Sequence, residues 1–266
     1  MKVYIISLYQ SDAENNKLLA TLLNKYGHDV CFIDAIPGSD INAIYYYSLI
    51  RTYLEKTKIL LTPSELGCVL SHKEALREFI ATGESHALIL EDDVIVDDLG
   101  LEKLSSIINN IQLFDGFINI GGLHSVYGSR KNIEGKIIQK SPEVCKIDND
   151  YLYMLHGNFA YLITPNDALK IFTLINDHPF IIDDYVYIYN NTKIKNFYLS
   201  PIFSHPVDRA KSTIQNERII RPKLKNTDKL IGRIYAEIKK SVYFKILCIK
   251  SFVKILIKLI DQNLVK

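Results

Sequence analysis

A short apolar run, Ala87-Leu88-Ile89-Leu90, ends abruptly in three acids, Glu91-Asp92-Asp93. An apolar run of this length between polar residues is typical of a fully buried strand, usually a central strand of a parallel sheet. Open α/β sheets bind ligands in the crevice beyond the carboxyl ends of such strands. Because three adjacent carboxylates repel one another, the triplet predicts a bound divalent cation, Mg²⁺ or Mn²⁺. A solvated acidic turn is the alternative interpretation.

Signals for strands and helices alternate along the chain. The segment Thr62-Pro63-Ser64-Glu65 is typical of a helix start, because Thr62 caps the first turn and Glu65 completes a capping box. Residues 40–61 receive no assignment, and residues 125–150 are expected to form a loop or hairpin. We expect strands at 2–8, 29–33, 87–90, 117–120 and 160–163, and helices at 12–26, 62–82, 101–112 and 165–176. This alternation predicts an α/β fold with a mostly parallel sheet and flanking helices.

Charge divides the chain into an acidic body and a basic end. Residues 221–266 hold 12 Lys and Arg against 3 Asp and Glu, a formal charge of +9. Residues 1–220 hold the other 20 Lys and Arg against 27 Asp and Glu, a charge of −7. We therefore expect a main domain over 1–220 and a separate basic segment over 221–266.

The basic segment has apolar positions at helical spacing, interrupted by lysines every four or five residues. No apolar run approaches the roughly 20 residues that span a bilayer. A basic amphipathic helix of this kind favours binding to an anionic membrane surface. A helix packed on the main domain or on a second subunit, in a homo-oligomer, is the alternative.

The cysteines and the N-terminus favour a cytoplasmic protein. The four cysteines are scattered without a CxxC pair, which argues against a disulfide framework or a structural zinc site. The apolar stretch at the start of the chain is too short for a signal peptide and is soon followed by polar residues, so we expect it to form the first strand. With the basic segment, this predicts a peripheral protein on the inner face of the cytoplasmic membrane.

Two long motifs stand out in the sequence, LTPSELGCVLSH at 61–72 and ALILEDDV at 87–94, with shorter ones at 157–164 and 182–186. They resemble those of glycosyltransferase family 25, the bacterial lipooligosaccharide glycosyltransferases and relatives of the collagen galactosyltransferases. The resemblance covers about residues 1–215. It implies a GT-A fold (a Rossmann-like α/β sheet), a nucleotide-sugar donor that is commonly UDP-galactose, a divalent metal, and inversion at the anomeric carbon.

With the resemblance, the acids become candidate ligands of that metal. Asp93 is the leading ligand and Glu91 the second, since alternate residues leaving a strand point to the same side. Asp92 is assigned instead to the donor ribose or to a backbone amide. His205 is a further candidate ligand by its late position in the resembled fold, and a structural histidine is the alternative.

Asp183 and Asp184 are candidates for the catalytic base. An inverting transfer needs a group that removes the acceptor hydroxyl proton, and a buried carboxylate is the usual choice. Asp183 matches the family motif better. The alternative is a helix N-cap, because an acid before the apolar stretch 185–189 is a common cap, and the two acids could divide these roles.

The remaining candidates are positions that the resemblance places near the donor. The residues on the helix at 62–82 have buried packing as an alternative, and those before residue 160 have a tight turn. At the end of the first strand this chain departs from the family, which often has Asn there. These candidates are Ser7, Leu8, Ser71, His72, Gly157 and Asn158.

The resulting hypothesis is a metal-dependent, inverting hexosyltransferase, a UDP-galactose-dependent β-galactosyltransferase acting on a lipooligosaccharide or lipopolysaccharide-type glycan. We expect no nucleic-acid partner. Two alternatives stay open. One is a non-catalytic glycan-binding protein on the same fold. The other is a metal-dependent phosphodiesterase or nucleotidyltransferase, which also uses clustered acids.

Overall fold

The computed structural model describes residues 1–8, 14–121, 133–206 and 213–224. The chain divides into two compact units, Met1–Gln215 and Asn216–Lys266. The predicted basic segment, 221–266, lies outside the described residues except for the end of one helix. No helix within the described ranges is long and apolar enough to cross a membrane.

The first unit is built on an eight-stranded sheet in the order β2-β1-β3-β7-β4-β8-β6-β5. Strands β7 and β6 run opposite to the other strands, so the predicted α/β class with a mostly parallel sheet is confirmed. The strands are β1 (Lys2–Ser7), β2 (Asp29–Asp34), β3 (Ala87–Glu91), β4 (Phe117–Asn119), β5 (Gly135–Lys140), β6 (Glu143–Ile147), β7 (Ala160–Ile163) and β8 (Phe197–Leu199).

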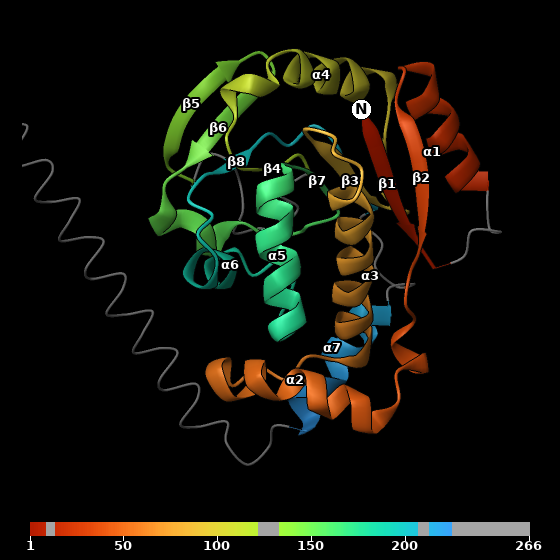
Figure 1. Ribbon diagram of the computed structural model, residues 1–266, viewed down its shortest axis with the longest axis vertical. Helices are drawn as coiled ribbons and strands as arrows, with labels where there is room; N and C mark the ends of the chain where they lie inside the picture. Colours follow the sequence, from red (N-terminus) through yellow and green to blue (C-terminus); the bar gives the residue numbers. More distant parts are fainter. Residues whose placement is uncertain (9–13, 122–132, 207–212, 225–266) are drawn as a thin grey trace, which may run out of the picture. The chain divides into compact units, whose positions relative to one another are not determined.

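Helices cover both faces of this sheet (Figure 1). Helices α2, α3, α5 and α6 pack on the face that buries Tyr4 and Ile89, and α1 and α4 pack on the face that buries Ile5 and Leu88. The helices are α1 (Glu14–Lys25), α2 (Ala43–Thr57), α3 (Pro63–Ile80), α4 (Asp98–Asn109), α5 (Pro165–Asp177), α6 (Tyr185–Asn191) and α7 (Thr213–Leu224), with short 3₁₀ turns at Gly38–Asp40, Ile111–Leu113 and Asn149–Met154.

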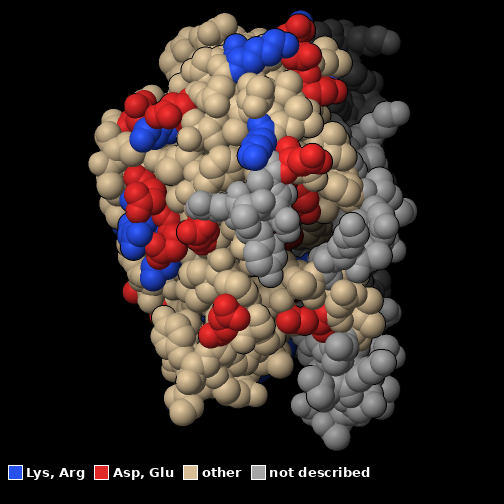
Figure 2. Space-filling model, turned by 90° about the vertical axis from the view of Figure 1, so that its right-hand side faces the viewer, with Lys and Arg blue, Asp and Glu red and all other residues tan. Residues whose placement is uncertain are grey.

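Charged side chains form several small groups on the face that carries α1 and β2 (Figure 2). An exposed ion pair joins Lys25 of α1 to Asp98 of α4 at 2.9 Å, and another joins Lys2 to Asp29 at 3.7 Å. Exposed pairs of this kind contribute little to stability, because water screens them and ordering two long side chains costs entropy. The packed interior therefore dominates the stability of this unit.

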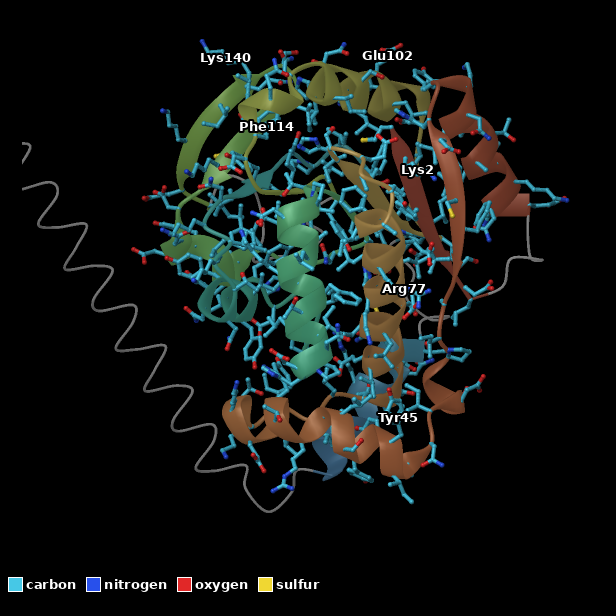
Figure 3. The ribbon with its side chains drawn as sticks, in the orientation of Figure 1. Lys2, Tyr45, Arg77, Glu102, Phe114 and Lys140 are labelled. Carbon is cyan, nitrogen blue, oxygen red and sulfur yellow. The ribbon has the colours of Figure 1, made fainter. Side chains whose placement is uncertain are left out.

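Side chains fill the space between the helices and the sheet (Figure 3). On one face the Phe117 ring stacks on Tyr161, with ring centroids 4.7 Å apart. On the other face Phe114, labelled in Figure 3, meets the edge of Tyr198 at 5.5 Å. Each central strand is buried on both sides, which explains why 87–90 is apolar at every position rather than alternating.

Most predicted elements are present, and the differences have local causes. Helix α4 begins at Asp98 rather than near 101, because the Asp97 side chain accepts a hydrogen bond from the Gly100 amide at 2.7 Å and caps the helix there. The unassigned stretch 40–61 contains α2, capped by Asn42. Within 125–150, β5 and β6 pair as a hairpin, and residues up to 132 lie outside the described part.

Helix α3 begins with the predicted capping box. The Thr62 side chain accepts from the Glu65 amide at 3.2 Å, and the Glu65 carboxylate accepts from the Thr62 amide at 2.7 Å. Further along, Gly67 has no side chain to collide with the Ile36 carbonyl, so the helix packs directly on the loop after β2. These contacts fix the position of α3 beside the end of β3.

Replacing Thr62 with alanine removes the oxygen that accepts from the Glu65 amide. We expect the free energy of unfolding to fall by about 1 kcal/mol, measured by urea denaturation of the full chain. Thr62→Ser keeps that oxygen and serves as the matched control. An equal loss in both variants would contradict the capping assignment.

Candidate active site

The candidate residues gather at one edge of the sheet. Strands β1, β3, β4 and β8 run in the same direction, so their carboxyl ends share an edge, and the antiparallel β7 begins there. Glu91 is the last residue of β3, and its amide donates to the Phe159 carbonyl at 2.8 Å. The acids thus lie at a strand's carboxyl end, where open α/β sheets bind ligands.

Each of the three acids has its own partner. His205 Nε2 lies 2.8 Å from Asp93 Oδ2, and this contact raises the pKa of His205 although partial burial opposes the shift. Burial raises the pKa of Asp92, and hydrogen bonds from the Ser7 hydroxyl and the Leu8 amide counter part of that rise. His72 Nε2 lies 3.4 Å from Glu91 Oε1.

His205 reaches this site through a short pairing between distant segments. The Ile95 amide donates to the Ser204 carbonyl at 2.8 Å, and the return bond measures 3.4 Å. This antiparallel bridge places the residue after Ser204 beside the acids that precede Ile95. The His205 ring also lies against Phe159, with ring centroids 5.2 Å apart.

Glu91, Asp93 and His205 fit a divalent metal. Each offers one ligand atom, and these atoms lie within 4.8 Å of one another. Two carboxylate oxygens and one imidazole nitrogen suit Mn²⁺ well, and Mg²⁺ would favour the two oxygens. Because the two carboxylates lie this close together, a cation between them relieves their mutual repulsion.

The two acids before α6 hold different positions. Asp184 is the N-cap of the helix: its Oδ1 accepts from the Tyr187 amide at 2.9 Å, and its Oδ2 accepts from the Tyr53 hydroxyl at 3.1 Å. Burial raises the pKa of Asp184 despite these bonds. Asp183 does not cap the helix, and its Oδ2 accepts from the Gly157 amide at 3.2 Å.

A buried polar network supports the turn that holds Asp183. Asn119, at the end of β4, donates to the Gly157 carbonyl at 2.7 Å and to the Tyr185 hydroxyl at 2.6 Å. The Tyr185 hydroxyl in turn donates to Asn158 Oδ1 at 3.1 Å. Gly157 has φ of +76°, a left-handed conformation that favours glycine. The hydrogen bonds thus hold the turn in place, and glycine at position 157 lets the backbone adopt it without strain.

The other predicted donor-site residues lie at the same edge in different surroundings. Ser71 is buried, donates to the Gly67 carbonyl at 2.7 Å and accepts from the Ile36 amide at 2.8 Å. Ser7 is buried and accepts from the Asn16 side chain at 2.9 Å, whereas Leu8 is exposed. The Asn158 side chain donates from its Nδ2 to the Ile182 carbonyl at 3.4 Å.

Sequence reasoning missed Asn119 and Tyr185. Asn119 had a usable signal, because a polar residue at the carboxyl end of an apolar strand lies where ligands and site residues gather. Tyr185 had no such signal, because it stands in an apolar stretch of the sequence. Only the tertiary fold brings its hydroxyl to Asn119.

The chain matches the family model described as glycosyltransferase family 25 (LPS biosynthesis protein) over residues 1–186. It is 25% identical over 231 residues to procollagen galactosyltransferase 2 of Homo sapiens, covering 77% of this chain and 35% of that protein. It is 24% identical over 180 residues to a glycosyltransferase 25 family member of Aedes aegypti, covering 64% of this chain and 27% of that protein.

The chain thus spans about a third of the length of these curated relatives. Among solved structures it is similar to a glycosyltransferase involved in glycosylation of the major capsid of PBCV-1, with a TM-score of 0.44 and 12% identity. That likeness covers 81% of this chain and 100% of the other. Since the family model matches well over half of the sequence, this chain belongs to glycosyltransferase family 25.

Proposed function

We propose that this protein is a metal-dependent, inverting hexosyltransferase that transfers galactose from UDP-galactose to a lipooligosaccharide or related glycan. The observation that carries the proposal is the group of Glu91, Asp93 and His205 at the carboxyl end of β3, in a member of a glycosyltransferase family. The names of the galactosyltransferase relatives support the donor. The family description, which mentions LPS biosynthesis, supports the acceptor.

In this proposal Glu91, Asp93 and His205 hold the metal. A divalent ion bound there supplies Lewis-acid stabilisation of the negative charge on the departing nucleoside diphosphate. Asp92 accepts hydrogen bonds from Ser7 and the Leu8 amide instead, so it is tied to the carboxyl end of β1. This division matches the partners of the three acids, because only Glu91 and Asp93 share a group with His205.

Asp183 is the proposed base. Both oxygens of Asp184 are occupied by the helix cap and by Tyr53, which favours Asp183 for proton transfer. As the acceptor oxygen bonds to the anomeric carbon, the bond from that carbon to the diphosphate oxygen breaks. The acceptor hydroxyl proton passes to the Asp183 carboxylate, and UDP leaves with the bonding electron pair.

Screening a panel of UDP-sugars for UDP release, with Mn²⁺ or with EDTA, tests this function. We expect release from UDP-galactose with Mn²⁺ and an acceptor glycan, and its loss with EDTA. Free phosphate or diphosphate as the product would indicate a phosphodiesterase or nucleotidyltransferase. Glycan binding without UDP release from any UDP-sugar would indicate a non-catalytic binding protein.

Asp93→Asn tests the metal assignment directly. We expect UDP release to fall by about 100-fold or more, because the variant loses a charged metal ligand. The matched control is Asp29→Asn, since Asp29 is an exposed carboxylate at the amino end of β2, on the opposite edge of the sheet. Ordinary EDTA-resistant transfer by Asp93→Asn would refute the mechanism.

The pH dependence of metal binding tests His205. Its pKa lies above the usual value because of Asp93, so below that raised pKa the imidazole is protonated and a metal must displace the proton. We expect the apparent Mn²⁺ affinity to rise about tenfold per pH unit up to the raised pKa and then to level off. The measurement is a Mn²⁺ titration at several pH values.

His205→Gln is the control for that titration. It removes the titrating ring, so the slope should flatten and the affinity at high pH should fall. The same slope in His205→Gln would assign the proton to another group and would remove His205 from the metal site.

The basic segment is proposed to hold the enzyme on the inner face of the cytoplasmic membrane. The support comes from the sequence. Residues 221–266 carry a charge of +9, and helical spacing places their lysines on one side of a helix and their apolar residues on the other. Near an anionic leaflet each lysine contributes on the order of 1 kcal/mol. A lipid-linked acceptor at that surface would then lie close to the enzyme.

Sedimentation with vesicles tests this proposal. We expect the full chain to sediment with vesicles that contain anionic lipid and to be released by added salt, because salt screens the charges. A variant ending at residue 228 is the control and should stay in solution. Equal binding to neutral vesicles, or sedimentation of the shortened chain, would assign the segment to packing instead.

A further inference from the structure

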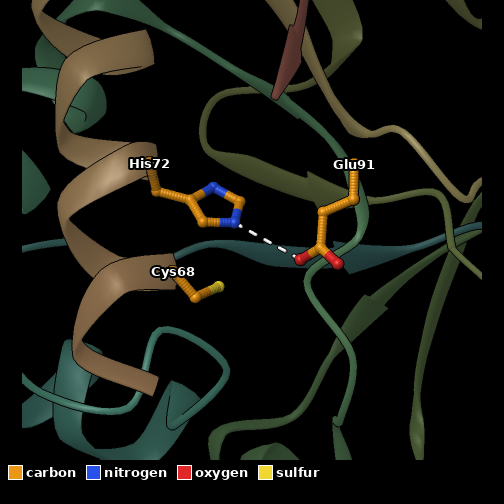
Figure 4. A group of neighbouring side chains, drawn as sticks. All are labelled: Cys68, His72 and Glu91. Carbon is orange, nitrogen blue, oxygen red and sulfur yellow. Dashed lines mark hydrogen bonds and ion pairs between the residues drawn. The ribbon is translucent and has the colours of Figure 1, made fainter. Parts of the chain in front are cut away.

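A second group of ligand atoms adjoins the acids on the side of α3. It consists of Cys68 and His72 on that helix and Glu91 at the end of β3, whose ligand atoms lie within 4.8 Å of one another. Figure 4 shows the Cys68 and His72 side chains leaving the same face of α3 and pointing toward the Glu91 carboxylate. Residues four apart on a helix are neighbours on one face, so α3 presents this pair together.

The spacing of His72 and Glu91 suits two ligands of one ion. His72 Nε2 and Glu91 Oε1 are 3.4 Å apart. Two ligands at bonds of about 2.0–2.1 Å from a tetrahedral zinc lie roughly 3.3–3.4 Å from each other. The Cys68 sulfur lies within 4.8 Å of both of these atoms and offers a third ligand, which leaves a fourth position for water.

Tyr161 holds the His72 ring for such a role. His72 is fully buried, its Nδ1 lies 3.1 Å from the Tyr161 hydroxyl, and the two rings stack with centroids 5.7 Å apart. A metal-bound histidine almost always places its other ring N–H on an oxygen acceptor, which fixes the ring's orientation. A tyrosine hydroxyl can donate or accept a hydrogen bond. Tyr161 therefore donates to Nδ1 when Nε2–H is directed at Glu91, and it accepts from Nδ1–H when Nε2 is bound to an ion.

The two groups differ in the ions they prefer. A thiolate and an imidazole select a thiophilic ion such as Zn²⁺, whereas Glu91, Asp93 and His205 offer a site rich in carboxylate oxygen. Glu91 belongs to both groups, and two divalent cations held at one carboxylate repel each other strongly, so filling one group disfavours filling the other.

We propose that Cys68, His72 and Glu91 form a binding site for a thiophilic divalent ion of the Zn²⁺ type, and that filling it withdraws Glu91 from Asp93 and His205. The first part stands on the geometry of the three side chains alone. The second part rests on the proposed metal-dependent function. The site would thus make Mn²⁺ binding sensitive to zinc.

Cobalt is the probe for the site itself, because Co²⁺ takes the place of Zn²⁺ and a cobalt–thiolate bond absorbs in the near ultraviolet. We expect the full chain to show this charge-transfer band with one Co²⁺ bound, and Zn²⁺ to abolish it. Cys68→Ser should lose the band. Cys31→Ser, which changes a partly buried thiol on β2 outside the group, should keep it.

A missing band in the unchanged protein, a band retained in Cys68→Ser, or a band lost in Cys31→Ser would each overturn the site. Circular dichroism of both variants shows whether the fold survives the substitution. If Cys68→Ser does not fold, His72→Gln provides the second test, since loss of the imidazole must shift the visible cobalt bands.

Free Mn²⁺, followed by its electron paramagnetic resonance signal, tests the coupling without any activity measurement. At Zn²⁺ ten times above its own dissociation constant, mutually exclusive binding weakens the apparent Mn²⁺ affinity by roughly tenfold. Cys68→Ser should bind Mn²⁺ as the unchanged protein does and should lose most of this competition. Unchanged competition in Cys68→Ser, or none in the unchanged protein, would refute the coupling, whereas absence of UDP release would refute only the proposed enzyme activity.

Discussion

The mutual repulsion of Glu91, Asp92 and Asp93 is the constraint on which the rest of this site depends. Three carboxylates on consecutive residues are stable at a half-buried strand end only when each has a hydrogen-bonding or charged partner. Three different elements supply them: His72 from α3, Ser7 from β1, and His205 from the segment after β8. The site is therefore assembled from the whole length of the first unit.

The side of the site near α6 is organised by neutral hydrogen bonds instead of charge. Asn119, Tyr185 and Asn158 are buried, and their side chains bond to one another or to the turn at Gly157. Buried polar groups are costly unless satisfied, so this network defines one arrangement of the turn rather than several. The amide that reaches Asp183 comes from that turn.

The parts predictable from sequence were those encoded by neighbouring residues. The buried strand before Glu91 is encoded by a few consecutive residues, and so is the capping box that begins at Thr62. Helix α2 escaped prediction because its run of isoleucine and tyrosine has weak helix propensity, although Asn42 caps it by accepting from the Ile44 amide. The antiparallel placement of β7 between β3 and β4 also escaped, since strand order depends on contacts far apart in the chain. Without that order, no local pattern could bring Asn119 to Gly157.

The position of Glu91 links these observations. As the last residue of β3 it is held by the sheet through its amide, while its carboxylate lies between the helix side and the loop side of the site. A strand end moves little, so a change of partner at Glu91 requires only rotation of its side chain. The ligands on the two sides differ in chemical softness. The helix side offers a sulfur and an imidazole, whereas the loop side offers a carboxylate and an imidazole. In the two proposed metal sites, the ion held at this strand end would therefore depend on whether Glu91 joins Cys68 and His72 or joins Asp93 and His205.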